Sequence, residues 1–179
     1  PHATGPDHSD TPRSAARILR YADKYVTVKQ GEVMYMTEAL ANLEGLERGP
    51  AGNTALAAAF SLAQEMPEDQ IIVISETEYT GAGKHIQPQL AFARDNGIEI
   101  KFGNPQAEDK PGENIVLPEK PGLIKHQVAD INRFRQSMIK RACKEAGVAP
   151  ENLTAEDIAY LAEETKTDAQ FVKDTLELA

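Results

Sequence analysis

Apolar residues recur at helical spacing in the first half of the chain. They stand three or four positions apart and predict a helix from about Glu32 to Leu46 with one buried face: Val33, Met36, Leu40 and Leu43. Gly45 would end that helix. A Gly/Pro turn leads into an alanine-rich helix that runs to about Glu65, and a β-branched run at Tyr25–Val28 predicts a short strand before both helices.

The run Ile71–Ile74 is continuously apolar, as are strands that are buried on both faces of a parallel sheet. A helix is predicted over residues 87–96, ended by Gly97, and a strand over residues 98–102. Helices that alternate with strands indicate an α/β layer. The stretch Gly103–Pro121 holds four prolines and many charges, which predicts a connecting loop.

The composition changes after this loop. A helix is predicted over Ala129–Ala146, with one apolar face made by Ile131, Phe134, Met138 and Ala142. Two shorter helices follow, for which Thr154 and Thr167 are the predicted N-caps. We therefore expect two domains, an α/β part over residues 1–121 and an all-helical extension over residues 122–179.

The charge and the cysteine count exclude several classes of function. Lys and Arg number 19 against 28 Asp and Glu, and a net charge of −9 disfavours broad attraction to nucleic acid or anionic membranes. The single cysteine, Cys143, has no partner for an internal disulfide and no histidine at helical spacing to activate it, so we interpret it as structural. With the four histidines it shows no metal-ligand spacing, and a reducing cytoplasm fits best.

The polar segment Ser75–His85 follows the predicted strand Ile71–Ile74. Ligands bind at the carboxyl ends of strands in open α/β sheets, so this segment is the candidate site. Its Gly-x-Gly-Lys end resembles a nucleotide phosphate loop. However, Glu78 and His85 stand where that motif requires Gly and Ser or Thr, which excludes it.

The order of elements over residues 24–84 resembles the back half of fold-type-II pyridoxal-phosphate enzymes, such as threonine synthases, threonine dehydratases and diaminopropionate ammonia-lyases. The resemblance implies a partial fold-type-II α/β domain, with a parallel-type sheet flanked by helices, followed by the helical extension. It also implies that a hydroxyl after the strand hydrogen-bonds the pyridine nitrogen of the cofactor. The candidates, in order of preference, are Thr77, Ser75 and Thr80.

The same resemblance places Glu44 near the cofactor ring, although a solvated carboxylate at a helix end is an equally good interpretation. In the family, the Schiff-base lysine and the phosphate-binding loop come well before this segment. We therefore expect both upstream of Pro1, and the chain to be a fragment that is inactive alone. No catalytic residue is assigned within it.

A closer resemblance, to the β-subunit family of 2-amino-4-oxopentanoate thiolases, is carried by three segments: residues 9–17, 44–56 and 76–85. It implies an acyltransferase of ornithine fermentation that uses pyridoxal phosphate and coenzyme A to give acetyl-CoA and alanine. The implied partners are an α subunit and the rest of the β subunit, in an oligomer. Arg13, Arg17 and His85 are candidates for contact with coenzyme A or the substrate, with solvated or ion-paired surface positions as the alternative.

Two other functions stay open at this stage. The core motif is shared across fold-type-II enzymes, so a threonine synthase-like enzyme or an ammonia-lyase is the first alternative. The acidic surface and the helical extension suggest the second, a non-catalytic interaction module.

Overall fold

The computed structural model describes Leu19, residues 21–75 and residues 85–178. They divide into two compact units. The α/β unit comprises Val26–Gln127, and the helical unit comprises the described residues up to Tyr25 together with those from Val128 onward. Two-residue strands, β1 (Val26–Thr27) and β4 (Gln127–Val128), lie where the chain passes from one unit to the other.

Three helices of the α/β unit confirm the predicted helices to within a few residues. They are α2 (Gln30–Glu44), α3 (Asn53–Ala63) and α4 (Gln87–Asp95). Gly45 ends α2 in the left-handed conformation, with φ of 68°, where a side chain would be strained. The glycine prediction is therefore also confirmed.

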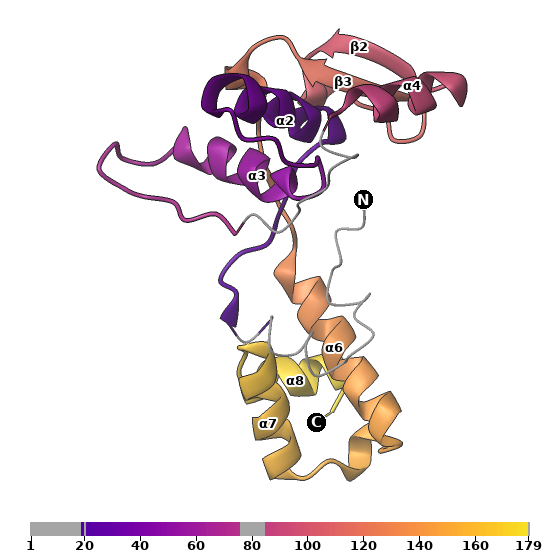
Figure 1. The fold of residues 1–179 in the computed structure, drawn as a ribbon. Helices are drawn as coiled ribbons and strands as arrows, with labels where there is room; N and C mark the ends of the chain where they lie inside the picture. Colours follow the sequence, from indigo (N-terminus) through magenta and orange to yellow (C-terminus); the bar gives the residue numbers. More distant parts are fainter. Residues whose placement is uncertain (1–18, 20, 76–84, 179) are drawn as a thin grey trace. The chain divides into compact units, whose positions relative to one another are not determined.

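The prediction of a connecting loop over Gly103–Pro121 was wrong. This stretch holds α5 (Pro105–Glu108) and β3 (Asn114–Pro118), which pairs in parallel with β2 (Glu99–Gly103) from Glu99 opposite Asn114 to Gly103 opposite Pro118. Figure 1 shows the two strands side by side near α4. All five residues of β3 are buried, and Pro118, which has no N–H to donate, is its last residue.

Helix α2 packs against β3 on one side and against α3 on another. The contact with β3 is so close that a Cβ added to Gly31 would lie 1.8 Å from the carbonyl oxygen of Val116. One apolar cluster joins α2 to α4 and β3: Met34, Ile86, Leu90, Ala93, Ile115 and Leu117. A second joins it to α3 and to the segment after β3: Val33, Met36, Ala57 and Ile124.

The prediction of a buried strand at Ile71–Ile74 was also wrong for the described structure. The segment is not a strand, and the side chains of Ile71 and Val73 are 88% and 91% exposed. Nothing in the described part of the chain pairs with it.

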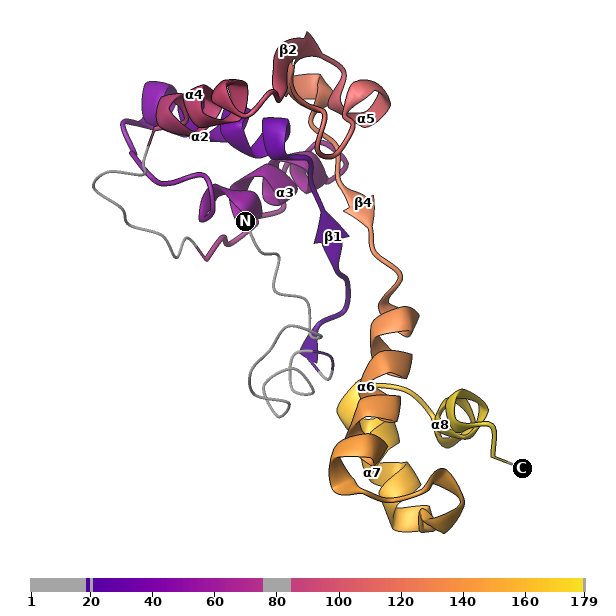
Figure 2. The same cartoon turned by 90° about the vertical axis from the view of Figure 1, so that its right-hand side faces the viewer.

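The helical unit contains α6 (Ile131–Ala146), α7 (Ala155–Thr165) and α8 (Ala169–Leu176), joined by short turns that include a 3-10 turn at Pro150–Asn152. Figure 2 shows the three helices around a common interior. Five buried side chains fill it: Ile139, Cys143, Leu161, Ala162 and Val172. The predicted helices over this region are confirmed.

Residues from the first part of the chain complete the helical unit. Leu19 is fully buried against Met138, and the rings of Tyr25 and Phe134 pack with their centroids 5.7 Å apart. The amide of Ala129 donates a hydrogen bond to the carbonyl oxygen of Tyr25 at 2.9 Å. This unit is therefore built from two segments that are far apart in sequence.

Of the two predicted N-caps, Thr154 is confirmed and Thr167 was wrong. The Thr154 hydroxyl accepts from the amide of Asp157 at 3.2 Å, and the Asp157 carboxylate accepts from the amide of Thr154 at 2.9 Å, which forms a capping box. Asp168 caps α8 instead, by accepting from the amide of Phe171 at 2.7 Å. The hydroxyl of Thr167 instead lies within hydrogen-bond distance, 2.9 Å, of the hydroxyl of Thr165.

Candidate functional site

The structure describes three of the seven site residues that the sequence suggests. Ser75, Glu44 and His85 are all exposed. The other candidates lie outside the described residues: Thr77, Thr80, Arg13 and Arg17. Glu44 is the last residue of α2, which agrees with its interpretation as a carboxylate at a helix end. None of the three described residues lines the hollow that is described below.

The described residues do not by themselves form a cradle for pyridoxal phosphate. A buried ring needs enclosing walls, and its phosphate needs several backbone amides or cations. Ser75 and Glu44 are both exposed, so neither contributes such a wall within the described residues. We therefore assign no reaction step through this cofactor.

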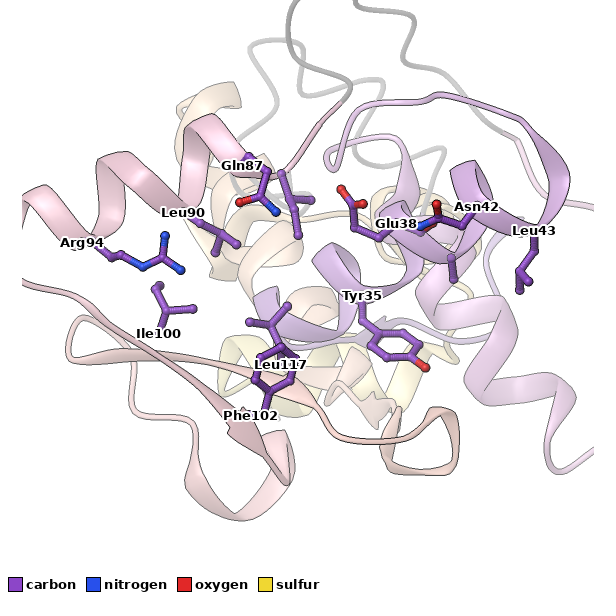
Figure 3. A pocket seen from close by; sticks show the side chains of 12 residues that line it. Tyr35, Glu38, Asn42, Leu43, Gln87, Leu90, Arg94, Ile100, Phe102 and Leu117 are labelled. Carbon is purple, nitrogen blue, oxygen red and sulfur yellow. The ribbon is translucent and has the colours of Figure 1, made fainter.

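The α/β unit has an open hollow of about 570 Å³ between α2, α4 and the paired strands (Figure 3). Its apolar lining comes mainly from α4 and the strands, with Leu90, Ile100 and Leu117 among its members. Figure 3 shows Glu38 and Asn42 on the α2 side and Arg94 on the α4 side. Such a volume is typical of binding pockets.

The lining of this hollow is mainly apolar, as in a binding pocket. Among the described residues that line it, the ionisable side chains are Tyr35, Glu38 and Arg94. Leu43 also lines it, and the prediction that Leu43 lies on the buried face of α2 was wrong, because its side chain is 80% exposed. No pattern in the sequence predicts this hollow, because its walls come from separate elements whose packing against one another could not be inferred.

A fully buried carboxylate, that of Glu32, lies at the start of α2. One of its oxygens accepts from the amide of Lys29 at 2.6 Å. The other accepts from the side-chain amide of Gln106 and from the backbone amide of Lys125, both at 2.8 Å. Glu32 thereby connects α2 to α5 and to the segment after β3.

This network is structural in its chemistry. Three donors satisfy the Glu32 carboxylate, and its complete burial leaves no route for a substrate. Sequence reasoning missed it because an acidic residue in the first turn of a helix is usually solvated and stabilised by the helix dipole.

A serine and a histidine also meet within the α/β unit. The hydroxyl of Ser61 on α3 lies 2.9 Å from Nδ1 of His126, and the backbone amide of His126 donates to the same hydroxyl at 2.8 Å. Ser61 is fully buried, so its hydroxyl is inaccessible to a substrate. Gln64 adds a bond to the carbonyl oxygen of Ile124 at 3.0 Å. The pair therefore fastens α3 to residues 124–126.

The Gly/Pro turn before α3 is held by Asn53, which is fully buried. Its side-chain amide donates to the hydroxyl of Thr37 at 3.1 Å and to the carbonyl oxygen of Arg48 at 3.3 Å. Thr37 in turn donates to the carbonyl oxygen of Val33 at 2.8 Å. The turn that contributes to the family resemblance is thus anchored to α2.

Other kinds of site find no support in the described part of the chain. No three or more His, Cys, Asp or Glu residues gather there in a way that could hold a metal ion. No helix within the described ranges has the length and hydropathy needed to cross a membrane. Cys143 is buried, and burial raises the pKa of its thiol, which agrees with a structural role.

Comparison with known proteins gives two close homologues. The chain is 66% identical over 176 residues to the 2-amino-4-ketopentanoate thiolase β subunit of Acetoanaerobium sticklandii, where ketopentanoate is a synonym of oxopentanoate. It is 57% identical over 176 residues to a protein of the same name from an unidentified prokaryote. No protein-family model and no solved structure gives a significant match. The two alignments cover 98% of this chain, which spans 37% of the length of each of these thiolase β subunits.

Proposed function

We propose that this chain forms part of the β subunit of a thiolase that cleaves 2-amino-4-oxopentanoate with coenzyme A. The observation that carries the proposal is the 66% identity, over 176 residues, to a protein with that name. The second homologue, at 57% identity over the same number of residues, supports it. Because the chain spans 37% of their length, the activity is proposed for the whole subunit and not for residues 1–179 alone.

The proposed reaction moves an acetyl group from carbon to sulfur. The thiolate of coenzyme A attacks the ketone carbon at position 4 of the substrate, and the bond from that carbon to carbon 3 breaks. Carbon 3 takes up a proton and becomes the methyl group of alanine, while the acetyl group leaves as acetyl-CoA. Atoms and electrons balance without an oxidant or a reductant.

Pyridoxal phosphate is the proposed cofactor of the whole subunit, on the ground of the fold-type-II resemblance. When bound, it would supply an electron sink to the amino-acid part of the substrate. Thr77 is the first candidate for contact with its ring, followed by Ser75 and Thr80. Arg13, Arg17 and His85 remain candidates for contact with coenzyme A or the substrate, and an α subunit is the proposed partner.

The decisive assay uses the full-length β subunit together with its α subunit. We expect acetyl-CoA and alanine in equal amounts, only when coenzyme A is present, and loss of both products when pyridoxal phosphate is removed. Release of ammonia without acetyl-CoA would contradict the thiolase proposal and favour an ammonia-lyase. A full-length subunit that binds no pyridoxal phosphate and forms no product would favour an interaction module.

A further inference from the structure

Helix α6 concentrates positive charge in an acidic chain. Five of its 16 residues are basic and one is acidic, whereas the 11 residues of α7 include four acidic residues and no basic one. The chain as a whole carries a net charge of −9. Helix α6 is therefore a local basic element on an acidic protein.

Three of these basic residues form a stripe along one face of α6, which we call the basic stripe: Arg133, Lys140 and Lys144. They stand seven and four positions apart, which places them within about 40° of one another around the helix axis. All three are exposed, and in the described part of the chain none of their side chains forms an ion pair or a hydrogen bond. The neighbouring Arg141, by contrast, is paired with Glu145, with Nε and Oε1 2.8 Å apart.

The stability of α6 does not account for the basic stripe. A cation in the last turn complements the helix dipole, which explains Lys144 alone. Arg133 lies in the first turn, where a cation is unfavourable. Lys140 and Lys144 repel each other, because residues four positions apart are neighbours on a helix. The stripe therefore works against the helix that carries it, which points to a partner of opposite charge.

A hollow of about 340 Å³ in the helical unit adjoins the stripe. Lys140 and Lys144 line it, together with apolar side chains from α6, from the turn after it and from α8: Cys143, Val148, Pro150 and Leu176. Anchor residues of protein interfaces fill apolar recesses of this kind. An apolar centre with charged groups at its border is the arrangement of a protein–protein interface.

We propose that the basic stripe and this hollow bind an acidic surface of the α subunit. Carboxylates of that surface would lie against Arg133, Lys140 and Lys144, and one of its apolar side chains would fill the hollow. Both homologues are named β subunits, so each belongs to an assembly with another subunit. The proposal rests on the part of the proposed function that assigns the chain to a thiolase β subunit with an α-subunit partner, and not on the reaction.

The charges argue against three other occupants. Two copies related by a two-fold axis would bring one basic stripe close to the other. A phosphate in the hollow would meet the carboxylate of Glu177 and the carboxyl-terminal ends of α6 and α8, which disfavour anions. The remainder of the β subunit belongs to the same chain, whereas opposite charges chiefly steer separate chains toward each other.

Chemical acetylation of lysines tests the proposal without any substitution. In the full-length β subunit, we expect Lys140 and Lys144 to be acetylated at least about 10-fold more slowly after the α subunit is added, because the interface excludes water and reagent. Lys120, an exposed lysine of the α/β unit, is the control and should react at an unchanged rate. Equal rates for Lys140 and Lys144 with and without the α subunit would overturn the proposal.

Three further outcomes of this experiment would overturn it by identifying a different occupant. Acetylation of Lys140 and Lys144 that is as slow in the β subunit alone as in the complex would show that the remainder of the β subunit covers them. Protection by coenzyme A in the absence of the α subunit would show a phosphate site. Protection that rises with the concentration of the β subunit would show a second copy.

Charge reversal gives an independent measurement. We expect Lys140→Glu and Lys144→Glu each to raise the Kd between the full-length β subunit and the α subunit at least about 10-fold, since each sets a carboxylate against an acidic surface. Lys120→Glu makes the same change of charge and should leave the Kd within about two-fold of wild type. An unchanged Kd for folded Lys140→Glu and Lys144→Glu would contradict the proposal, and if these variants do not fold, the acetylation of wild type decides.

The result is separable from that of the thiolase assay. Protection of Lys140 and Lys144 by the α subunit without acetyl-CoA formation would uphold the docking surface and reject the proposed reaction. Acetyl-CoA formation with no such protection would uphold the reaction and reject the docking surface.

Discussion

The buried carboxylate of Glu32 accepts a hydrogen bond from the backbone amide of Lys125, 93 residues further along the chain, at 2.8 Å. Together with Gln106 and Lys29, this bond holds three parts of the α/β unit to one side chain. The carboxylate is fully buried, so when any of its hydrogen-bond partners is lost, no water can replace that partner.

Glu32→Ala should lower the free energy of unfolding by about 3 kcal/mol, because the donors of Lys29, Gln106 and Lys125 lose their acceptor. Urea unfolding followed by circular dichroism measures the change. Glu65→Ala, at an exposed position, is the control and should stay within about 0.5 kcal/mol of wild type. Equal stability of the two variants would contradict a structural role for Glu32.

Gly31→Ala should be destabilising by about 3 kcal/mol, since the new Cβ would lie 1.8 Å from the carbonyl oxygen of Val116 and force α2 away from β3. Thermal unfolding gives the measurement. Gly122→Ala is the matched control, because a Cβ there meets no atom within 4 Å. If both glycines tolerate alanine equally, the close approach of α2 to β3 is wrong.

The capping box of α7 predicts a pH dependence. Hydrogen bonds from the side chain and the backbone of Thr154 hold the pKa of Asp157 below its ordinary value of 3.8. The resulting stability is present above about pH 3.8 and is lost as the pH falls through the lowered pKa. We expect Asp157→Asn to unfold at a lower temperature than wild type at pH 6, with the difference shrinking by pH 2.

The control for this pH series is Glu156→Gln, which changes an acidic residue of the same helical turn outside the capping box. Its difference from wild type should vary less with pH than that of Asp157→Asn. An Asp157→Asn difference that stays constant from pH 6 to pH 2 would show that ionised Asp157 adds no stability.

Cys143 should resist modification in the folded protein. It is 6% exposed, and burial raises the pKa of its thiol above the ordinary value of 9.0, so little thiolate forms at pH 8. We expect Ellman's reagent to react at least about 100-fold more slowly with residues 1–179 in buffer than in urea. The sequence contains one cysteine, so the signal is unambiguous, and equal rates would contradict its burial.

The helices could be predicted from the sequence because their apolar faces repeat every three or four residues, as α2 and α6 show. Strand β3 was missed because its apolar core, Ile115–Leu117, is short and stands among prolines and charges. The buried side chain of Asn114 in that strand accepts from the amide of Lys110 and donates to the carbonyl oxygen of Glu108. Hydrogen bonds of this kind cannot be predicted from the composition of a segment.

The candidate site shows a different limit of sequence reasoning. The apolar pattern of Ile71–Ile74 predicts a strand, but a strand also needs a neighbour, and no described residue provides one. The burial of Glu32 could not be anticipated either, because it depends on donors that are 3, 74 and 93 residues away. Local sequence describes which side chains are available, and tertiary contacts decide which of them become buried.

The two-segment construction of the helical unit has a consequence for synthesis on the ribosome. Leu19 and Tyr25 are translated before the α/β unit, whereas their packing partners Met138 and Phe134 are translated after it. When Gln127 emerges from the ribosome, the whole sequence of the α/β unit is available, whereas the residues of α6, α7 and α8 have still to emerge. The α/β unit can therefore fold first during translation, whereas Leu19 and Tyr25 can be buried only after α6 has emerged.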